Sequence, residues 1–390
     1  MSKRVCVVTG SRAEYGLLKP LLRETKKDRA LKLQLVVTGM HLSSEFGLTY
    51  KEIEDDGFPI DEKVDIKLKS DTPSGIAASV GYGVRGFAEV YERLKPDMVV
   101  VLGDRFEILS SVIPAHLARI PVVHLHGGEV TQGAFDDAFR HAITKMSQLH
   151  FTSNESYRKR VIQLGEDPKR VYNVGAIGLD DISRLKFLSK TELEKNWQFQ
   201  FGRYNLLITF HPVTLEENTS SEHFRQLLCA LADLPETHFI FTKANADTHG
   251  KIINRMMDDY VKKNAQKAIA FASLGRLKYL STMRLVDGVV GNSSSGVIEA
   301  PSFKIGTVDI GDRQKGRVCA KSIIHCHPNK KAIQRAIQKL YSKEFQKLLK
   351  KVVNPYQKNN TALHIKQIIK DFNIKTLKKE FFDIPFNKRS

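Results

Sequence analysis

The stretch VVVLGDRFEILSSVIPAHLARIPVVHLHGGE, residues 99–129, decides the fold that we expect for this chain. Its apolar runs at 98–102 and 121–123 are separated by one segment in which apolar residues have helical spacing. Such runs are typical of parallel strands that are buried on both faces. Open parallel sheets bind ligands beyond the carboxyl ends of their strands. The residues that follow the two runs are therefore expected to share one crevice: Asp104, Arg105, His126 and Glu129.

Strand and helix alternate in this way through most of the chain. The pattern predicts strands in the first half at 4–10, 33–39, 149–153 and 171–175, and a short strand region at 55–67. After a helical, linker-like stretch at 178–201, it predicts strands at 205–210, 238–242, 268–272, 288–291 and 305–310. This alternation is typical of doubly wound parallel sheets.

We therefore predict an α/β protein with two Rossmann-like lobes. The N-terminal lobe is placed at residues 1–180, the second lobe at 181–350, and a basic, helical segment at 351–390. Two lobes that face each other predict a ligand site in the cleft between them.

The formal net charge of +18 over 390 residues is compatible with either nucleic acid or an anionic substrate as partner. Lysine is concentrated in the last third of the chain, where we interpret much of the charge as solvated helix faces. The sequence contains nothing that resembles an RRM, KH or zinc-finger signature. Nucleic acid is therefore not an expected partner.

The four cysteines lack the spacing of metal ligands, although His325 and His327 flank Cys326. The turn at Gly10-Ser11-Arg12 does not match G-x-G-x-x-G, so no dinucleotide is inferred. We expect neither a metal nor another cofactor. No apolar run reaches the roughly 18 residues of a membrane span, and no cleavable leader precedes the first strand. We expect a reduced, cytoplasmic protein without a membrane partner.

The segment GNSSSG at 291–296 follows an expected strand and opens a helix that carries Glu299. Its hydroxyls and helix N–H groups suit a pyrophosphate, although one serine could simply cap the helix. Arg313 and Arg317 could supply countercharge, and Arg12 in the first turn could hold a phosphate. Ser293 and Ser294 are therefore candidate anion ligands.

Acid–base chemistry is expected from the first lobe. Asp104, Glu129, Asp136 and Asp137 are all there, and two carboxylates on opposite faces of a sugar ring could exchange protons with one carbon. Helix capping would equally explain the pair at 136–137, and an ion pair would explain Asp104. Two further candidates end strands of the second lobe: His211, and Asn245 in the cluster at 243–247, which could also be a helix cap.

Six motifs together resemble the hydrolysing UDP-N-acetylglucosamine 2-epimerases of bacterial sialic acid synthesis. They are SRAEYG at 11–16, GDRFE at 103–107, HGGEV at 126–130, DDAFRHAITKMS at 136–147, HP at 211–212 and GNSSSG at 291–296. The resemblance implies a GT-B fold whose C-terminal helix crosses back to the first lobe. It also implies a homodimer or homotetramer.

The resemblance implies that UDP-GlcNAc and water give UDP and N-acetylmannosamine through a 2-acetamidoglucal. Ser293 and Ser294 then resemble diphosphate ligands and Glu299 a ribose ligand. His211, Arg313 and Arg12 resemble phosphate contacts, while Asp104 and Asp136 match two catalytic carboxylates of the family.

The sequence departs from the family at one position. Several members have H-x-E-G-G-E, whereas HLHGGE here places His126 at the glutamate position. Either His126 or Glu129 could take over the second acid–base role. The pattern also resembles the branch that acts on UDP- or GDP-linked 2,4-diacetamido sugars for legionaminic acid. A GT-B glycosyltransferase is a more distant alternative.

Overall fold

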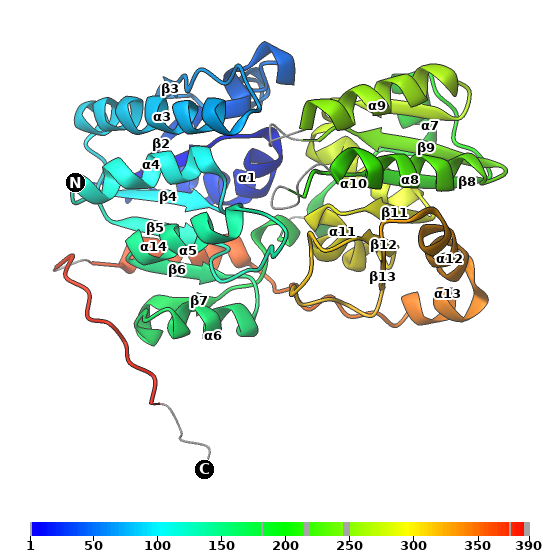
Figure 1. Ribbon diagram of the computed structural model, residues 1–390. Coiled ribbons are helices and arrows are strands. Elements are labelled where there is room, and N and C mark those ends of the chain that lie inside the picture. Colours follow the sequence, from blue (N-terminus) through cyan, green and yellow to red (C-terminus); the bar gives the residue numbers. More distant parts are fainter. Residues whose placement is uncertain (1, 181, 214–218, 245–249, 374–375, 386–390) are drawn as a thin grey trace.

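The computed structural model describes residues 2–180, 182–213, 219–244, 250–373 and 376–385. Figure 1 shows two α/β lobes side by side, with the last helix returning to the first lobe. This confirms the predicted α/β fold with two Rossmann-like lobes. The boundaries at residues 180 and 350 stay predictions.

The first lobe is a seven-stranded parallel sheet in the order β3-β2-β1-β4-β5-β6-β7. Its strands are β1 (Lys3–Thr9), β2 (Leu31–Thr38), β3 (Glu62–Val64), β4 (Met98–Leu102), β5 (Val122–Leu125), β6 (Leu149–Thr152) and β7 (Val171–Asn173). Its helices are α1 (Arg12–Lys27), α2 (Tyr50–Asp55), α3 (Pro73–Leu94), α4 (Phe106–Leu117), α5 (Asp136–Met146) and α6 (Glu155–Gln163).

The second lobe has a six-stranded parallel sheet in the order β10-β9-β8-β11-β12-β13, so it repeats the winding of the first. Its strands are β8 (Tyr204–Thr209), β9 (Thr237–Thr242), β10 (Ala268–Phe271), β11 (Gly288–Gly291), β12 (Gly306–Ile310) and β13 (Ile323–Cys326). Its helices are α7 (Lys190–Trp197), α8 (Ser220–Ala232), α9 (Gly250–Lys263), α10 (Gly275–Leu285), α11 (Ser294–Ile298), α12 (Lys330–Tyr341) and α13 (Lys343–Leu349).

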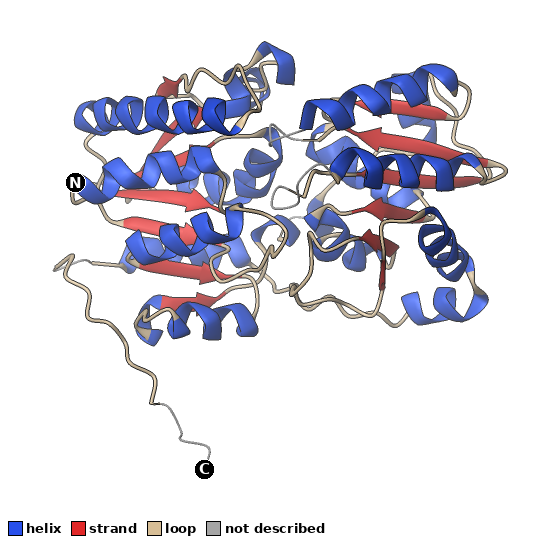
Figure 2. Ribbon diagram, in the orientation of Figure 1, coloured by secondary structure: helices blue, strands red, loops and turns tan. Residues whose placement is uncertain are grey.

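Helices cover both faces of each sheet because successive strand residues are apolar. In β1, Val5 and Val7 join the core under α1, whereas Cys6 joins the core under α3 and α4. Figure 2 shows the strands of both sheets pointing toward the interface between the lobes. The carboxyl ends of both sheets therefore face each other, which places the two sets of strand-end loops together.

Helix α14 (Thr361–Asp371) belongs to the packing of the first lobe. Ala362, Ile365 and Ile369 are buried in the same cluster as the α1 leucines. The ammonium group of Lys3 donates to three carbonyls at the end of this helix, those of residues 369, 370 and 372. The chain thus crosses from the second lobe back to the first.

Two details differ from the prediction. The region 55–67 holds only the three-residue strand β3, preceded by α2. Strand β13 was not predicted, because its sequence IIHC is short and His325 on it is exposed. It pairs with β12 at the edge of the second sheet.

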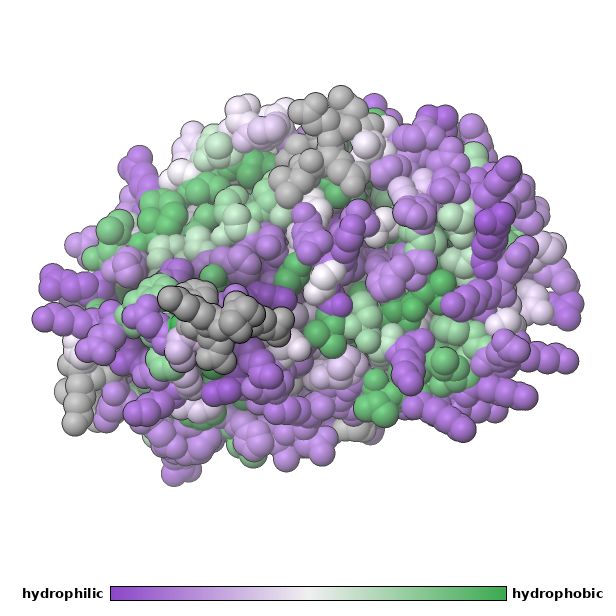
Figure 3. Space-filling view, turned by 60° about the horizontal axis from the view of Figure 1, so that its bottom comes forward, coloured by the Kyte–Doolittle hydropathy of each residue, from purple (hydrophilic) through white to green (hydrophobic). Residues whose placement is uncertain are grey.

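The basic residues of α12 and α13 are largely exposed, as on solvated helix faces. Figure 3 shows hydrophilic side chains projecting over much of one face of the molecule. The exposed cations include Lys331, Arg335, Lys339, Lys343 and Lys347. None of the helices in the described ranges combines the length and the apolar character that crossing a bilayer requires.

Candidate active site

A pocket lies between the lobes, at the ends of strands β8, β9 and β11. The first lobe contributes the start of α1, including Arg12 and Gly16. The second lobe contributes the loop before α10 and the GNSSSG segment. Six residues predicted as site residues line this one pocket: Arg12, His211, Ser293, Ser294, Glu299 and Arg313.

The GNSSSG turn presents its hydroxyls to this pocket. Gly291 has a φ of 139° and lies so close to the Thr209 carbonyl that a Cβ there would overlap it, so the turn requires glycine. Ser293 caps α11 by accepting from the Ser295 N–H, and its hydroxyl lies 3.2 Å from that of Ser295. Tyr279 on α10 contacts the Ser295 hydroxyl at 2.5 Å. Capping and ligand presentation therefore occur in the same turn.

Asn292 ties three strand-end loops of the second lobe together. Its side-chain oxygen accepts from the His211 N–H at 2.7 Å, and its amide donates to the His211 carbonyl at 2.8 Å. Arg313, in the loop after β12, donates to the Asn292 carbonyl at 3.2 Å. His211 and Arg313 are thus fixed against the same residue.

Glu299 closes the inner wall of the pocket. Burial raises the pKa of its carboxyl, and the opposing effects of Arg276 and His126 are smaller. Arg276 lies 3.9 Å away, and its guanidinium also donates to the Gly178 carbonyl of the first-lobe side. The HGGE loop lies near this wall, because the Ile177 N–H contacts His126 Nε2 at 3.4 Å and the carbonyl of the next residue, Gly178, accepts from Arg276 of the pocket.

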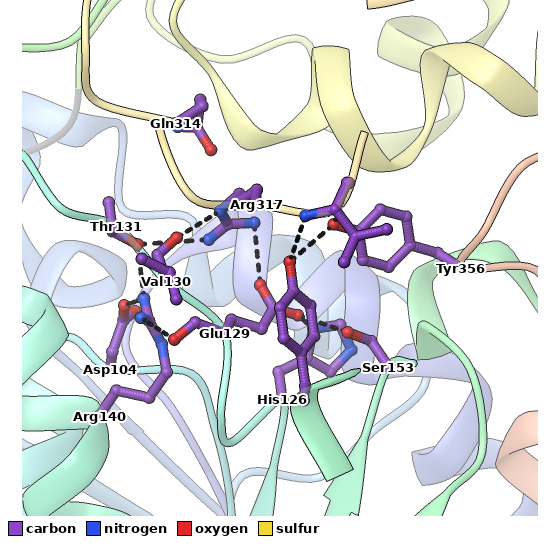
Figure 4. A network of polar contacts seen from close by, with 12 residues as sticks. Asp104, His126, Glu129, Val130, Thr131, Arg140, Ser153, Gln314, Arg317 and Tyr356 are labelled. Carbon is purple, nitrogen blue, oxygen red and sulfur yellow. Dashed lines mark hydrogen bonds and ion pairs between the residues drawn. The ribbon is translucent and has the colours of Figure 1, made fainter. Parts of the chain in front are cut away.

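The candidate carboxylate Asp104 is ion-paired with Arg140 of α5 (Figure 4). Arg140 is almost fully buried, and it also pairs with Asp137 at 2.8 Å and donates to the Thr131 hydroxyl. Asp137 additionally accepts from the Thr131 N–H at 2.7 Å. The ion-pair alternative for Asp104 is therefore present, but about a fifth of its side chain stays accessible.

Glu129 and His126 form a second buried cluster (Figure 4). One Glu129 oxygen lies 2.9 Å from His126 Nδ1 and accepts from Ser153 at 2.8 Å, while the other lies 2.9 Å from Arg317. Burial alone would raise the pKa of Glu129, but Arg317 and His126 outweigh it and lower that pKa to about 2. Glu129 is a stable carboxylate at neutral pH.

Of the remaining candidates, Asp136 and Arg105 are not among the described residues that line this pocket. Asp136 is buried in the first turn of α5. Arg105 pairs with the buried Glu107 at 2.6 Å, directly under the first turn at Gly10. Asn245 lies outside the described residues, although Lys243 just before it lines the pocket. The described residues include no group of three or more His, Cys, Asp or Glu arranged to hold a metal ion.

Comparison with known proteins assigns the family. The family model described as UDP-N-acetylglucosamine 2-epimerase matches residues 23–370. The chain belongs to this family.

Three relatives are similar over most of their length. A Campylobacter jejuni GDP/UDP-N,N'-diacetylbacillosamine 2-epimerase (hydrolyzing) is 47% identical over 88% of this chain and 89% of its own. The Escherichia coli polysialic acid biosynthesis protein P7 is 41% identical over 98% of both chains. A Neisseria meningitidis UDP-N-acetylglucosamine 2-epimerase is 33% identical over 87% of this chain and 88% of its own.

Solved structures show the same fold as this 2-epimerase. A crystal structure of the UDP-GlcNAc 2-epimerase from Neisseria meningitidis, bound to UDP-GlcNAc, aligns with a TM-score of 0.80 at 16% identity. It covers 94% of this chain and 99% of that one. A Listeria monocytogenes structure aligns over 98% and 100% with a TM-score of 0.78 at 18% identity. The fold of this 2-epimerase is thus GT-B-like.

Sequence reasoning did not single out three residues that the structure places at the site. Tyr279 and Arg276 come from α10, whose helical pattern gave no functional signal. Arg140 lies within the DDAFRHAITKMS motif, but nothing in the sequence selects it from that motif. Its burial beside two predicted carboxylates would have indicated a functional role, but that burial arises only in the folded protein.

Proposed function

We propose that this 2-epimerase hydrolyses a UDP-linked 2-acetamido sugar and releases UDP and the free sugar inverted at C2. The observation that carries the proposal is the interlobe pocket. Hydroxyls and cations of the second lobe line it, and the first-lobe loop that carries His126 lies beside it, because His126 contacts Ile177 and the neighbouring Gly178 carbonyl accepts from Arg276 of the pocket.

UDP is assigned to the second lobe. Ser293 and Ser294 offer hydroxyls to the diphosphate, and Glu299 offers a carboxylate to the ribose. Arg12, His211 and Arg313 line the same pocket and stabilise charge that develops on the leaving diphosphate. The positive charge arrives from both lobes, so a bound diphosphate would hold them together.

The chemistry is elimination followed by hydration. A base removes the C2 proton while the C1–O bond breaks and UDP leaves, which gives a 2-acetamidoglucal. Water then adds at C1, and a proton returns to C2 from the opposite face. Each proton transfer needs a group of suitable basicity within hydrogen-bond reach.

We assign one proton-transfer role to His126 and the other to Asp104 or Asp136. Glu129 is a weak base, because both of its oxygens are engaged and its pKa is about 2. His126 therefore takes the role left open by the HLHGGE departure. Asp104 and Asp136 are the candidates for the second face of the sugar.

Two sugars are candidates. The relative of highest identity among those described is named for diacetylbacillosamine nucleotides, and so is a Legionella pneumophila relative at 34% identity. These names favour the 2,4-diacetamido alternative, with N,N'-diacetylbacillosamine as the sugar, which the first name links to GDP or UDP and the second to UDP. Similarity to the Neisseria meningitidis UDP-N-acetylglucosamine 2-epimerase keeps UDP-GlcNAc, with N-acetylmannosamine as product, as the second candidate.

The test is incubation with each nucleotide sugar separately in deuterated water. We expect UDP, free sugar inverted at C2, and one deuterium at C2 for at least one donor. A higher kcat/KM for the diacetamido donor would place the enzyme in the legionaminic branch, and the reverse would assign UDP-GlcNAc. Sugar released with retained C2 configuration and no deuterium would reject epimerisation for either donor. Gel filtration with light scattering tests the expected homodimer or homotetramer.

A further inference from the structure

The side chain of Arg317 crosses from the second lobe into the HGGE loop of the first (Figure 4). Its Nη1 lies 2.9 Å from a Glu129 oxygen, and its Nε donates to the Val130 carbonyl at 3.0 Å. Only 6% of the Arg317 side chain and 4% of the Glu129 side chain are exposed. This is a desolvated ion pair between lobes, and the two charges depend on each other.

The other oxygen of Glu129 contacts the imidazole of His126. It lies 2.9 Å from Nδ1, and Ser153 donates to the same oxygen at 2.8 Å. Because the pKa of Glu129 is about 2, this oxygen can only accept at neutral pH. The proton of a neutral His126 is therefore on Nδ1, and the lone pair is on Nε2.

The backbone of His126 also needs outside support. Its φ of 65° is in the left-handed region, which a residue with a Cβ adopts only when its surroundings hold it there. The Ile177 N–H makes a long contact of 3.4 Å with Nε2. The bonds through Glu129 are the shorter ones, so they dominate the orientation of the ring.

The loop that carries Arg317 is itself held against the first lobe. The Val318 N–H donates to the hydroxyl of Tyr157 at 3.0 Å, and the Val318 carbonyl accepts from Tyr356 at 2.7 Å. The same loop carries Arg313, which lines the pocket. One segment of the second lobe thus touches both the nucleotide pocket and the support of His126.

We propose that Arg317 and Glu129 are positioning residues that set the tautomer and orientation of His126, so that the base is assembled only when the lobes are closed. The inference rests on the proposed function for the identity of the base. It gives Arg317 of the second lobe a role in the chemistry of the first lobe. Closure of the lobes on a nucleotide would then orient His126 for proton transfer.

The test compares Glu129→Gln and Arg317→Lys with Lys315→Ala, an exposed residue of the same loop. We expect Glu129→Gln to lower kcat by about 10²–10⁴-fold, the usual worth of a general base. Calorimetry should show UDP affinity within about threefold of wild type, since Glu129 does not line the pocket. Arg317→Lys keeps the positive charge but loses the planar guanidinium that contacts both Glu129 and Val130. Its kcat should therefore lie between those of wild type and Glu129→Gln. The Lys315→Ala control should match wild type.

The split between kcat and KM separates positioning from mere stability. Glu129→Gln should lower kcat while KM stays within about threefold of wild type, since Glu129 does not line the pocket. Glu129→Gln with kcat within threefold of wild type would overturn the proposal.

A readout without turnover keeps this inference distinct from the proposed function. In protein labelled with ¹⁵N-histidine, long-range ¹H–¹⁵N spectra report the tautomer, and His126→Gln assigns the signal. We expect Nδ1–H in wild type and a mixture in Glu129→Gln. The same mixture in wild type would reject the positioning role, whereas a pure Nδ1–H tautomer with no deuterium in the product would reject only the 2-epimerase reaction.

Discussion

The guanidinium of Arg12, in the first lobe, lies directly against the α-carbon of Gly275, in the second. Arg12 begins α1 and Gly275 begins α10, and both line the interlobe pocket. A Cβ at position 275 would overlap the Arg12 guanidinium, and the φ of Gly275 is 67°. Glycine is therefore needed there both for the backbone and for the close approach of the two lobes.

Gly275→Ala should displace Arg12 and open the pocket. We expect weaker UDP binding by about tenfold, the worth of one charge-assisted contact, together with a lower kcat/KM. Isothermal titration calorimetry with UDP measures the effect. Gly81→Ala is the matched control, because Gly81 lies in α3 and a Cβ added there would meet no atom within 4 Å. The control should keep UDP affinity and gain about 0.5–1 kcal/mol of stability. Equal UDP affinity in both variants would contradict the close approach.

Asp104→Asn tests whether the carboxylate paired with Arg140 takes part in proton transfer. We expect kcat to fall by about 10²–10⁴-fold, the contribution of a general acid or base. The melting temperature should change little, because Asp137 still neutralises Arg140. Steady-state kinetics and thermal unfolding check the two parts separately. A rate within a few-fold of wild type would mean that Asp104 acts only as the ion-pair partner of Arg140.

The sequence predicted the site where the chemistry follows directly from a strand end. GNSSSG, His211 and Arg12 were predicted from turns, and the parallel winding brings them to one pocket. Asp104 was predicted in the same way, but it does not line this pocket; the structure shows the ion pair with Arg140, and its catalytic role stays a prediction. Local pattern is informative here because the carboxyl ends of parallel strands meet at one edge.

The contacts that were missed join residues far apart in the sequence. Arg317 was predicted as countercharge for an anion, but its position beside Glu129 depends on how the lobes meet, and no local pattern encodes it. Strand β13 was missed because an edge strand with an exposed histidine lacks the continuous apolar run of a central one. Our proposal of His126 as the base rests on the bonds already made by the Glu129 oxygens, and these bonds also depend on the fold.

A buried acid in the first turn makes stability depend on pH. Glu14 accepts from the Gly10 N–H at 2.8 Å, and burial raises its pKa to about 8, with a smaller contribution from Glu107. Between about pH 4.5 and pH 8 the folded state therefore keeps a proton that the unfolded state has lost. Stability should fall as pH rises through this window.

Glu14→Gln removes that penalty while it keeps an oxygen for the Gly10 N–H. We expect its melting temperature relative to wild type to increase from pH 5 to pH 8 by at least about 2 °C. Differential scanning fluorimetry at both values measures the difference. Glu24→Gln, in the same helix and in a surface pair with Lys27, should show no such trend. A constant offset for Glu14→Gln would mean that the acid is ionised in the folded state throughout.

The C-terminal segment is anchored to the first lobe by Lys379. Its ammonium donates to both oxygens of the buried Glu166, at 3.0 and 2.8 Å, and to the carbonyls of Lys145 and Ser147. Next to it, Phe381 packs against Gly165, so closely that a Cβ there would overlap the ring. The anchor is therefore a buried charge pair with four acceptors for one ammonium.

Lys379→Met should release this segment and lower the melting temperature by about 2–4 °C, as expected for roughly 1 kcal/mol in a single lobe of about 180 residues. The loss is moderate because Glu166 keeps Lys145 at 2.6 Å and His150 at 3.0 Å. Limited chymotrypsin digestion should cleave after Phe381 or Phe382 faster than in wild type. Lys378→Met, at an exposed neighbour, should leave both measurements unchanged.

A double variant tests whether Lys379 acts through Glu166. If it does, adding Glu166→Gln to Lys379→Met should lower the melting temperature by less than Glu166→Gln does in the wild-type protein, because the two charges are lost together. Simple addition of the two effects would show that Lys379 holds the segment through the two carbonyls instead.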